Sequence, residues 1–133
     1  MSRLFGENWT WPVRVYWEDT DAGGVVYYAN YLKFMERART EWLRSLGVSQ
    51  SSLERERGVL FMVLHVEVDY RSPARLDDEL IVSCRAAPDG RTSAIFEQAI
   101  HRADGELLIE GRVRVVCVDA KSLRPRRMSE YLP

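Results

Sequence analysis

Hydrophobic and polar residues alternate differently in two parts of the chain. From residue 29 to residue 46 apolar residues recur every three or four positions, and Gly47 follows where a helix would end. This periodicity predicts one long amphipathic helix. A second, shorter helix or turn is expected near residues 49–57. Elsewhere the period is close to two, which is typical of strands.

The strand-like segments lie on both sides of the helical segment. Residues 12–18 alternate between apolar and polar side chains and predict a first strand. Residues 60–72 predict a longer, half-buried strand, whose even-numbered face would meet the helix. That face carries Met62, Leu64, Val66, Val68 and Tyr70.

Three more strands are expected at residues 79–87, 92–102 and 107–119, because short Asp-Gly turns at residues 88–90 and 103–105 separate them. Such a succession predicts an antiparallel meander. One long helix and about five strands bury each other best as an α+β fold, in which a curved antiparallel sheet wraps around the helix. We expect a single domain over residues 1–133. The strand near the end, VRVVCVD, is apolar on both parities, which favours burial on both faces and therefore an oligomer.

Composition narrows the class of protein. The 19 basic and 20 acidic residues give a net charge of −1, which argues against a nucleic-acid-binding protein that depends on a positive field. Cys84 and Cys117 lack the CxxC spacing and are expected to be reduced and buried, which favours the cytoplasm. No apolar stretch approaches the length of a membrane span, and the opening residues do not resemble a signal peptide.

The acidic segment before the helix carries the candidate chemistry. Asp19 and Asp21 precede the pair Gly23 and Gly24, and acidic residues in such a loop are most often turn formers or caps. Glycines, however, let a ligand approach the main chain. A thioester needs little machinery, because its leaving thiolate has a conjugate acid with a pKa of about 8.5. Asp21 is therefore the candidate catalytic carboxylate, as a nucleophile or as a general base.

The start of the helix offers a second functional group. If the helix begins near Ala29, the backbone N–H of Tyr28 or of its neighbours points toward the loop of Asp21 and can hold negative charge on a carbonyl oxygen. The tyrosine rings at residues 27, 28 and 31 are more often packing groups than ligands. For Asn30 we favour a structural role as a helix cap over a role in binding.

Other catalytic groups are scarce. His65 and His101 both fall in strand-like segments and are expected on a surface or at an interface rather than as bases. Neither belongs to a metal-ligand motif, so no metal is expected. No motif for binding nucleotide phosphates is present. The basic residues near the end of the chain either form a solvated tail or bind phosphates of coenzyme A. They are Lys121, Arg124, Arg126 and Arg127.

The stretch RVYWEDTDAGGVVYYAN, residues 14–30, resembles the signature of the hotdog-fold 4-hydroxybenzoyl-CoA thioesterases. The stretches FMERARTEWLRSLG, DYRSPARLDDEL and VRVVCVDAKSLRPR resemble the Tol-Pal-associated, YbgC-like acyl-CoA thioesterases. The resemblance implies a cytoplasmic hydrolase in which Asp21 is the catalytic carboxylate and the Tyr28 N–H polarises the thioester carbonyl. It also implies dimers with a continuous sheet, often paired into homotetramers, with active sites between protomers. Coenzyme A would be part of the substrate, with no separate cofactor.

One residue separates the two branches of this resemblance. The YbgC-like proteins commonly have His at the position of Tyr28, whereas the hydroxybenzoyl branch resembles this chain. The acyl group therefore stays open among short-chain, long-chain and aromatic acids. Two alternative functions are a hotdog hydratase or dehydratase, which would want a histidine beside the carboxylate, and a non-catalytic acyl-thioester-binding or Tol-Pal accessory protein.

Overall fold

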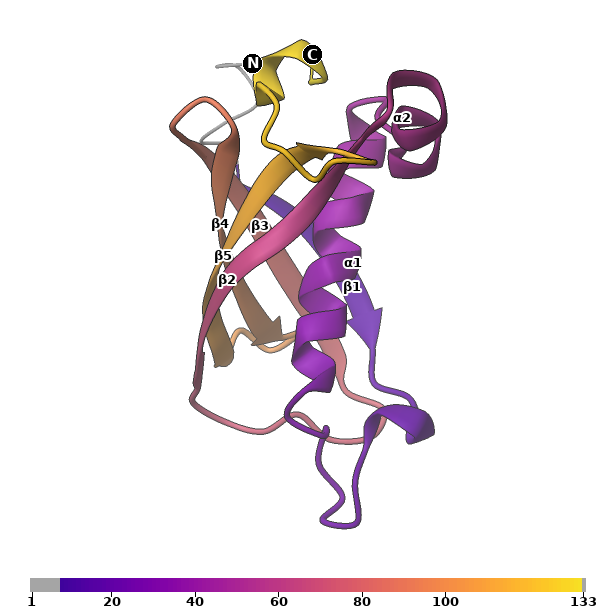
Figure 1. Cartoon of the computed structure of the whole chain (residues 1–133). Helices are drawn as coiled ribbons and strands as arrows, with labels where there is room; N and C mark the ends of the chain where they lie inside the picture. The colour runs from indigo at the N-terminus through magenta and orange to yellow at the C-terminus, as the bar shows by residue number, and fades with distance from the viewer. Residues whose placement is uncertain (1–7, 133) are drawn as a thin grey trace.

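The computed structural model describes residues 8–132; residues 1–7 and 133, which belong to the expected domain and opening segment, lie outside it. Helix α1 lies across the concave face of one curved sheet (Figure 1). The elements are β1 (Trp9–Arg14), the 3-10 turn η1 (Trp17–Asp19), α1 (Asn30–Ser45), α2 (Gln50–Arg57), β2 (Val59–Tyr70), β3 (Glu79–Asp89), β4 (Ser93–Arg102), β5 (Leu107–Asp119) and the 3-10 turn η2 (Met128–Glu130).

The sheet has five strands in the order β1-β3-β4-β5-β2, and every neighbouring pair is antiparallel. The expected α+β architecture and the meander β3-β4-β5 are therefore confirmed. The short helix α2 is also present, with Ser49 as its N-cap and Gly58 in the left-handed conformation after its end. The two edges of the sheet are β1 and β2.

The core lies between α1 and the sheet. Phe34, Met35 and Ala38 of α1 are almost fully buried against inward-facing residues of the strands. The helix comes close to the sheet at Gly111, where a Cβ atom would lie 2.6 Å from Met35 Cε and 3.3 Å from the Glu67 carbonyl oxygen. A side chain at this position would have to displace the end of the Met35 side chain from the core and would press on the Glu67 carbonyl of β2.

The first strand differs from the prediction. Strand β1 begins at Trp9 and ends at Arg14, and the chain then leaves the sheet for a turn that includes Trp17. The Asp19 carboxylate accepts a hydrogen bond from the Tyr16 N–H at 2.8 Å, which closes this turn. A side chain that satisfies the backbone locally competes with the strand ladder, and alternation alone does not reveal it.

The prediction that the even-numbered residues of β2 face the helix is wrong for the half of the strand before Leu64. Val63 pairs with Val115 and His65 pairs with Arg114, so Leu64 is an unpaired bulge. Before the bulge odd-numbered residues share the face of Val115, and after it even-numbered residues such as Val66 do. Because β2 is also an edge strand, residues 62–64 and 66 remain between 39% and 55% exposed. The expected half-buried strand is an open apolar edge.

The apolar residues on both faces of β5 are explained only in part by the expected burial against a partner subunit. Val118 at the end of β5 is buried, and the segment after it folds back beside this strand end. The Arg126 N–H donates to the Cys117 carbonyl at 2.8 Å, and the Asp119 N–H donates to the Arg124 carbonyl at 2.8 Å. This part of the apolar surface is covered by the chain itself. The feature that points to a partner is instead the exposed edge of β2.

Candidate active site

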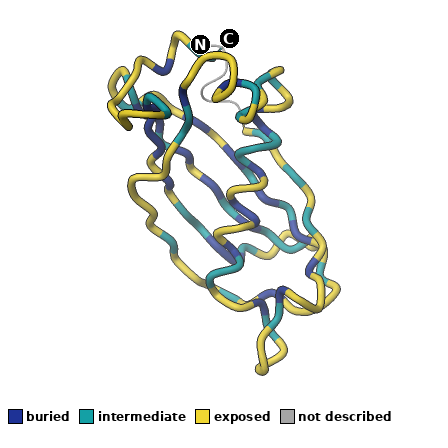
Figure 2. The backbone as a smooth tube through the Cα atoms, turned by 45° about the vertical axis from the view of Figure 1, so that its right-hand side comes forward, coloured by how far each residue is buried: buried dark blue, intermediate teal, exposed yellow. Residues whose placement is uncertain are grey.

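Residues 19–27 form a hairpin that projects from the body of the molecule below the start of α1 (Figures 1 and 2). The Tyr27 N–H donates to the Asp19 carbonyl at 2.9 Å, and the Asp21 N–H donates to the Val25 carbonyl at 2.9 Å. Gly24 closes the tip with φ = +77°, a conformation that few other residues adopt. The hairpin returns the chain to α1 with Asp21 near its exposed tip.

The two aspartates of this hairpin have different environments. Asp19 is 8% exposed, and its carbonyl accepts hydrogen bonds from the Tyr27 N–H and from Asn30 Nδ2. Asp21 is exposed; its Oδ1 accepts from the Gly23 N–H at 2.8 Å, while Oδ2 accepts no hydrogen bond from residues 8–132. Asp19 thus braces the loop, and Asp21 is the carboxylate that is available for chemistry.

Helix α1 begins without a side-chain cap. The structure places its first residue at Asn30, as expected, with Ala29 at the N-cap position. The Asn30 amide donates to the Asp19 carbonyl at 2.9 Å instead of capping the helix, so its role is structural but the expected cap is wrong. Within residues 8–132 the backbone N–H groups of Tyr28 and Ala29 donate to no acceptor. Free donors at a helix start are suited to bind an oxyanion.

An aromatic cluster supports this end of the helix. The Tyr70 hydroxyl donates to the Tyr28 carbonyl at 3.1 Å, and the rings of the two residues meet edge to face with centroids 6.2 Å apart. The buried Tyr31 hydroxyl accepts from the Ala74 N–H at 3.0 Å, and burial raises the pKa of this phenol. These contacts fix the turn at Tyr28 while leaving its N–H free.

An open cavity of about 250 Å³ lies beside Tyr28. Tyr70 and Arg71 from the end of β2 line it together with Tyr31 and Val26. The sequence analysis did not single out Tyr70 or Arg71 as site residues. The signal that could have found them is weak, because it requires knowing that the end of the long strand lies under the start of the helix.

The other candidates lie away from Asp21. His65 is exposed on β2, 3.1 Å from the Glu67 carboxylate, and His101 is half-buried on β4. The basic residues 121–127 follow β5 at the opposite end of the molecule from the hairpin (Figure 1). The 16 residues of α1 span about 24 Å between these ends. One protomer therefore does not bring its own basic segment to its own Asp21.

That basic segment contains one strong ion pair. Arg126 lies 2.9 Å from the Asp119 carboxylate. The backbone N–H of Ser122, Arg126 and the backbone N–H of Lys121 all hold the pKa of Asp119 well below its usual range. Within the described residues, Lys121, Arg124 and Arg127 form no ion pair. The unpaired charges are available to an anionic ligand.

The cysteines are buried and unpaired with each other, as expected. Burial raises the pKa of Cys84 to about 12 and that of Cys117 to about 11. Both are neutral thiols near neutral pH, so neither serves as a nucleophile. Of the helices in the described part of the chain, none is both long enough and apolar enough to cross a bilayer.

Comparison with known proteins identifies the family. Residues 15–132 match the model of the thioesterase-like superfamily. The chain belongs to this superfamily. It is 52% identical over 122 residues to the acyl-CoA thioester hydrolase YbgC of Escherichia coli O6:H1, an alignment that covers 92% of this chain and 90% of that protein. It is 43% identical to the acyl-CoA thioesterase YbgC of Haemophilus influenzae, over 92% of this chain and 89% of that protein.

Solved structures agree with this assignment. The crystal structure of a probable thioesterase from Bartonella henselae superposes with a TM-score of 0.86 at 32% identity and covers 92% of this chain and 99% of that chain. The expected hotdog fold and the expected enzyme class, thioester hydrolysis, are thereby confirmed.

Proposed function

We propose that this enzyme hydrolyses the thioester of an acyl-CoA to the free acid and coenzyme A. Asp21 is the nucleophile or the general base, and the Tyr28 N–H holds the oxyanion. The observation that supports this assignment best is the start of α1, where two N–H groups lack acceptors within residues 8–132 beside a hairpin that presents an exposed carboxylate. The rest of the chemistry follows from these two groups.

The reaction balances by either route. In the nucleophilic route an Asp21 oxygen adds to the thioester carbon, the C–S bond breaks, and the departing thiolate takes up a proton. Water then cleaves the mixed anhydride, which releases the acid and restores Asp21. In the general-base route Asp21 takes a proton from water while the water oxygen attacks the same carbon. The tetrahedral intermediate then collapses with cleavage of the C–S bond, and the departing thiolate takes up the proton that Asp21 holds, which restores the carboxylate. The Tyr28 N–H stabilises the tetrahedral oxyanion in both, and coenzyme A is substrate rather than cofactor.

A second copy of the chain would complete the site. The open edge of β2 exposes Met62, Val63, Leu64 and Val66, and a long unpaired apolar edge favours pairing with another strand. Antiparallel pairing of two copies of β2 would place opposite strand ends side by side. The basic segment that follows β5 in one protomer would then approach the hairpin of the other and receive phosphates of coenzyme A.

The oligomer is tested by substitution on this edge. Leu64→Lys should convert a dimer or tetramer into a folded monomer, because it places a charge in the centre of the apolar edge. Trp17→Lys, at an exposed residue of the turn that follows the opposite edge strand β1, is the control. Size-exclusion chromatography with light scattering gives the mass, and a wild-type chain that is already monomeric would contradict the proposal. A homotetramer, a cytoplasmic location and a link to Tol-Pal stay predictions.

The catalytic assignment is tested by thiol release. Short-chain, long-chain and hydroxybenzoyl-CoA thioesters should be offered to wild type and to Asp21→Asn, after circular dichroism shows that both are folded. Loss of the carboxylate should lower kcat by at least about a hundredfold, and the best substrate selects the acyl class. Activity that survives in Asp21→Asn would mean that another group is catalytic. Binding without turnover by wild type would favour an acyl-thioester-binding or accessory role.

A further inference from the structure

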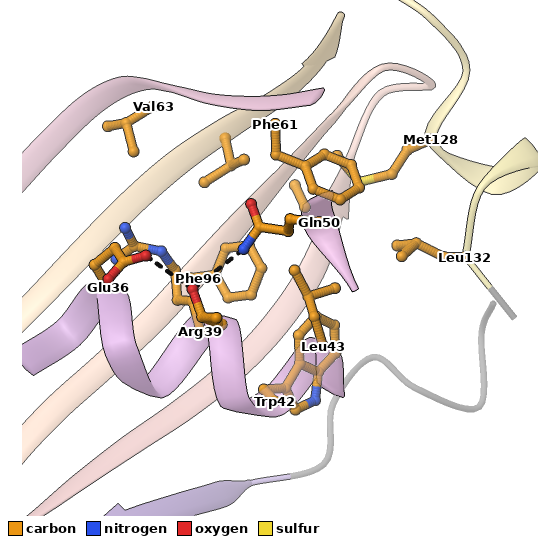
Figure 3. Close-up of a pocket in the computed structure, with 13 residues that line it drawn as sticks. Glu36, Arg39, Trp42, Leu43, Gln50, Phe61, Val63, Phe96, Met128 and Leu132 are labelled. Carbon is orange, nitrogen blue, oxygen red and sulfur yellow. Dashed lines mark hydrogen bonds between the residues drawn. The ribbon is translucent and has the colours of Figure 1, made fainter. Parts of the chain in front are cut away.

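A second cavity, of about 130 Å³, lies beside the C-terminal half of α1, away from the hairpin (Figure 3). Its walls come from α1, the sheet and the C-terminal segment, and most of them are apolar. The apolar walls include Leu43, Phe61, Val63, Phe96, Val115 and Met128. Phe96, Val115 and Met128 are each less than 8% exposed, so much of this surface belongs to the molecular interior.

One cation lies in this apolar setting. Arg39 lines the cavity and is only partly exposed, and burial lowers the pKa of its guanidinium. Its Nη1 donates to Gln98 Oε1 at 2.9 Å, and Gln98 in turn donates to the Met35 carbonyl at 2.9 Å. No carboxylate of residues 8–132 lies within ion-pair distance of Arg39. The charge of Glu36, one turn away, acts to raise the pKa of Arg39, but burial outweighs it. A partly buried charge that no carboxylate contacts directly costs stability, which a ligand of opposite charge would recover.

The nearest acidic side chain is engaged elsewhere. Glu36, one turn before Arg39 and also at the cavity, accepts a hydrogen bond from the Thr40 hydroxyl at 2.8 Å. Gln50 of α2 donates to the same hydroxyl at 3.1 Å (Figure 3). These contacts hold Glu36 against Thr40, so most guanidinium donors of Arg39 are left for another acceptor.

From this arrangement we propose that the cavity binds a small carboxylic acid with a compact apolar group, whose carboxylate pairs with Arg39. The volume suits a group about the size of one six-membered ring, since an engineered cavity of about 150 Å³ accommodates benzene. A planar guanidinium suits a carboxylate in particular, because it donates two parallel hydrogen bonds. Within one protomer the cavity contains no residue of the hairpin. Because Val63 also lies on the open edge of β2, the proposed pairing of two copies would bring the partner subunit to this side of the cavity.

Isothermal titration calorimetry with benzoate tests the proposal, with benzyl alcohol as the neutral counterpart of the same size. Wild type should bind benzoate at millimolar concentration and bind benzyl alcohol more weakly. Arg39→Gln should weaken benzoate by at least about tenfold, because a charge-assisted contact is lost. Arg39→Lys, which keeps the charge without the planar fork, should give an intermediate affinity. The exposed Arg37→Gln is the matched control and should bind as wild type does.

The acidic neighbour sharpens the test. Glu36→Gln removes a negative charge from the cavity and should tighten benzoate, the opposite change from Arg39→Gln. Circular dichroism checks that each variant is folded. Absence of benzoate binding, or equal weakening by Arg37→Gln and Arg39→Gln, would overturn the proposal. So would binding that Asp21→Asn abolishes while the Arg39 variants leave it unchanged, because the acid would then occupy the catalytic hairpin. Each of these outcomes can be distinguished from a failure of thioester hydrolysis itself.

Discussion

The surroundings of α1 differ between its start and its second half. At the start, the Asp21 carboxylate is exposed and two backbone N–H groups have no acceptor within residues 8–132. Further along the helix, the Arg39 guanidinium is partly buried among mostly apolar side chains. Asp21 lies on a hairpin that projects below the start of α1, and the Tyr28 N–H at this helix start has no acceptor within residues 8–132. Arg39 lines a partly open cavity and donates a hydrogen bond to Gln98. One helix thus provides two environments of opposite polarity.

The difference shows how burial changes what a charge can do. An exposed carboxylate keeps its solvation until substrate arrives, which fits the proposed role of Asp21 toward a thioester that enters from solvent. A partly buried guanidinium has already lost solvation and gains most from an anion that enters with an apolar group. The first end is therefore suited to chemistry, and the second to selective binding.

The largest expected effect is on catalysis at the start of α1. Tyr28→Pro removes the backbone N–H without removing any hydrogen bond of the described chain, and should lower kcat by about 10²–10³ through loss of an oxyanion donor. Tyr28→Phe keeps the N–H and should retain most activity. Steady-state kinetics with circular dichroism on both variants tests this. Equal losses in both would assign the role to the hydroxyl group of Tyr28.

A smaller effect separates the two aspartates of the hairpin. Asp19→Ala leaves the Tyr16 N–H without its acceptor in a turn where Asp19 is buried, and should lower the free energy of unfolding by about 1–3 kcal/mol. The exposed Asp21→Ala should change it by less than about 0.5 kcal/mol. Urea denaturation gives both values. A larger loss for Asp21→Ala would show that the catalytic candidate is also the structural brace.

The smallest effect is expected near the second cavity, where the charge of Arg39 acts to lower the pKa of Cys84 but burial outweighs it. Burial raises the pKa of this thiol to about 12, whereas an unfolded chain loses the proton near pH 8.5. Between these values the folded state holds more protons than the unfolded state. The free energy of unfolding should therefore fall as pH rises above about 8.5, by up to about 1.4 kcal/mol per pH unit for this thiol.

Denaturant titrations at pH 8, 9 and 10 measure this slope. Cys84→Ala should be flatter than wild type across this interval, although the lost side chain lowers its stability at every pH. A residual slope is expected from Cys117, whose pKa burial raises to about 11. Identical slopes for wild type and Cys84→Ala would show that the buried thiol does not titrate as proposed.

Local patterns predicted most of the elements. The periodicity over residues 29–46 and the turns at residues 88–90 and 103–105 reflect constraints within a few residues, and α1 and the three meander strands formed at the expected places. The first strand was displaced because the Asp19 side chain closes a turn that periodicity does not report. The face of β2 was wrong because the bulge at Leu64 changes parity within the strand.

The candidate site was predicted in part. The hairpin, the start of α1 and the position of Tyr28 could be located from Gly23, Gly24 and the beginning of the helical period. The contributions of Tyr70 and Arg71 could not, because they depend on a contact between residues more than forty positions apart, as the bond from Tyr70 to Tyr28 shows. The position of Arg39 could not be predicted either, because the helical period does not distinguish it from the other charged residues of α1.

By itself, the sequence determined the class of fold, the order of the elements and the family, because each depends on local periodicity and on a contiguous motif. The packed structure was needed to show which aspartate is exposed, which N–H groups lack acceptors within residues 8–132, and which arginine is partly buried with no carboxylate in direct contact. The physical reason is that solvation and pairing depend on every element packed around a group. The residues that surround a group in space, unlike its neighbours in the chain, come together only when the sheet packs around α1.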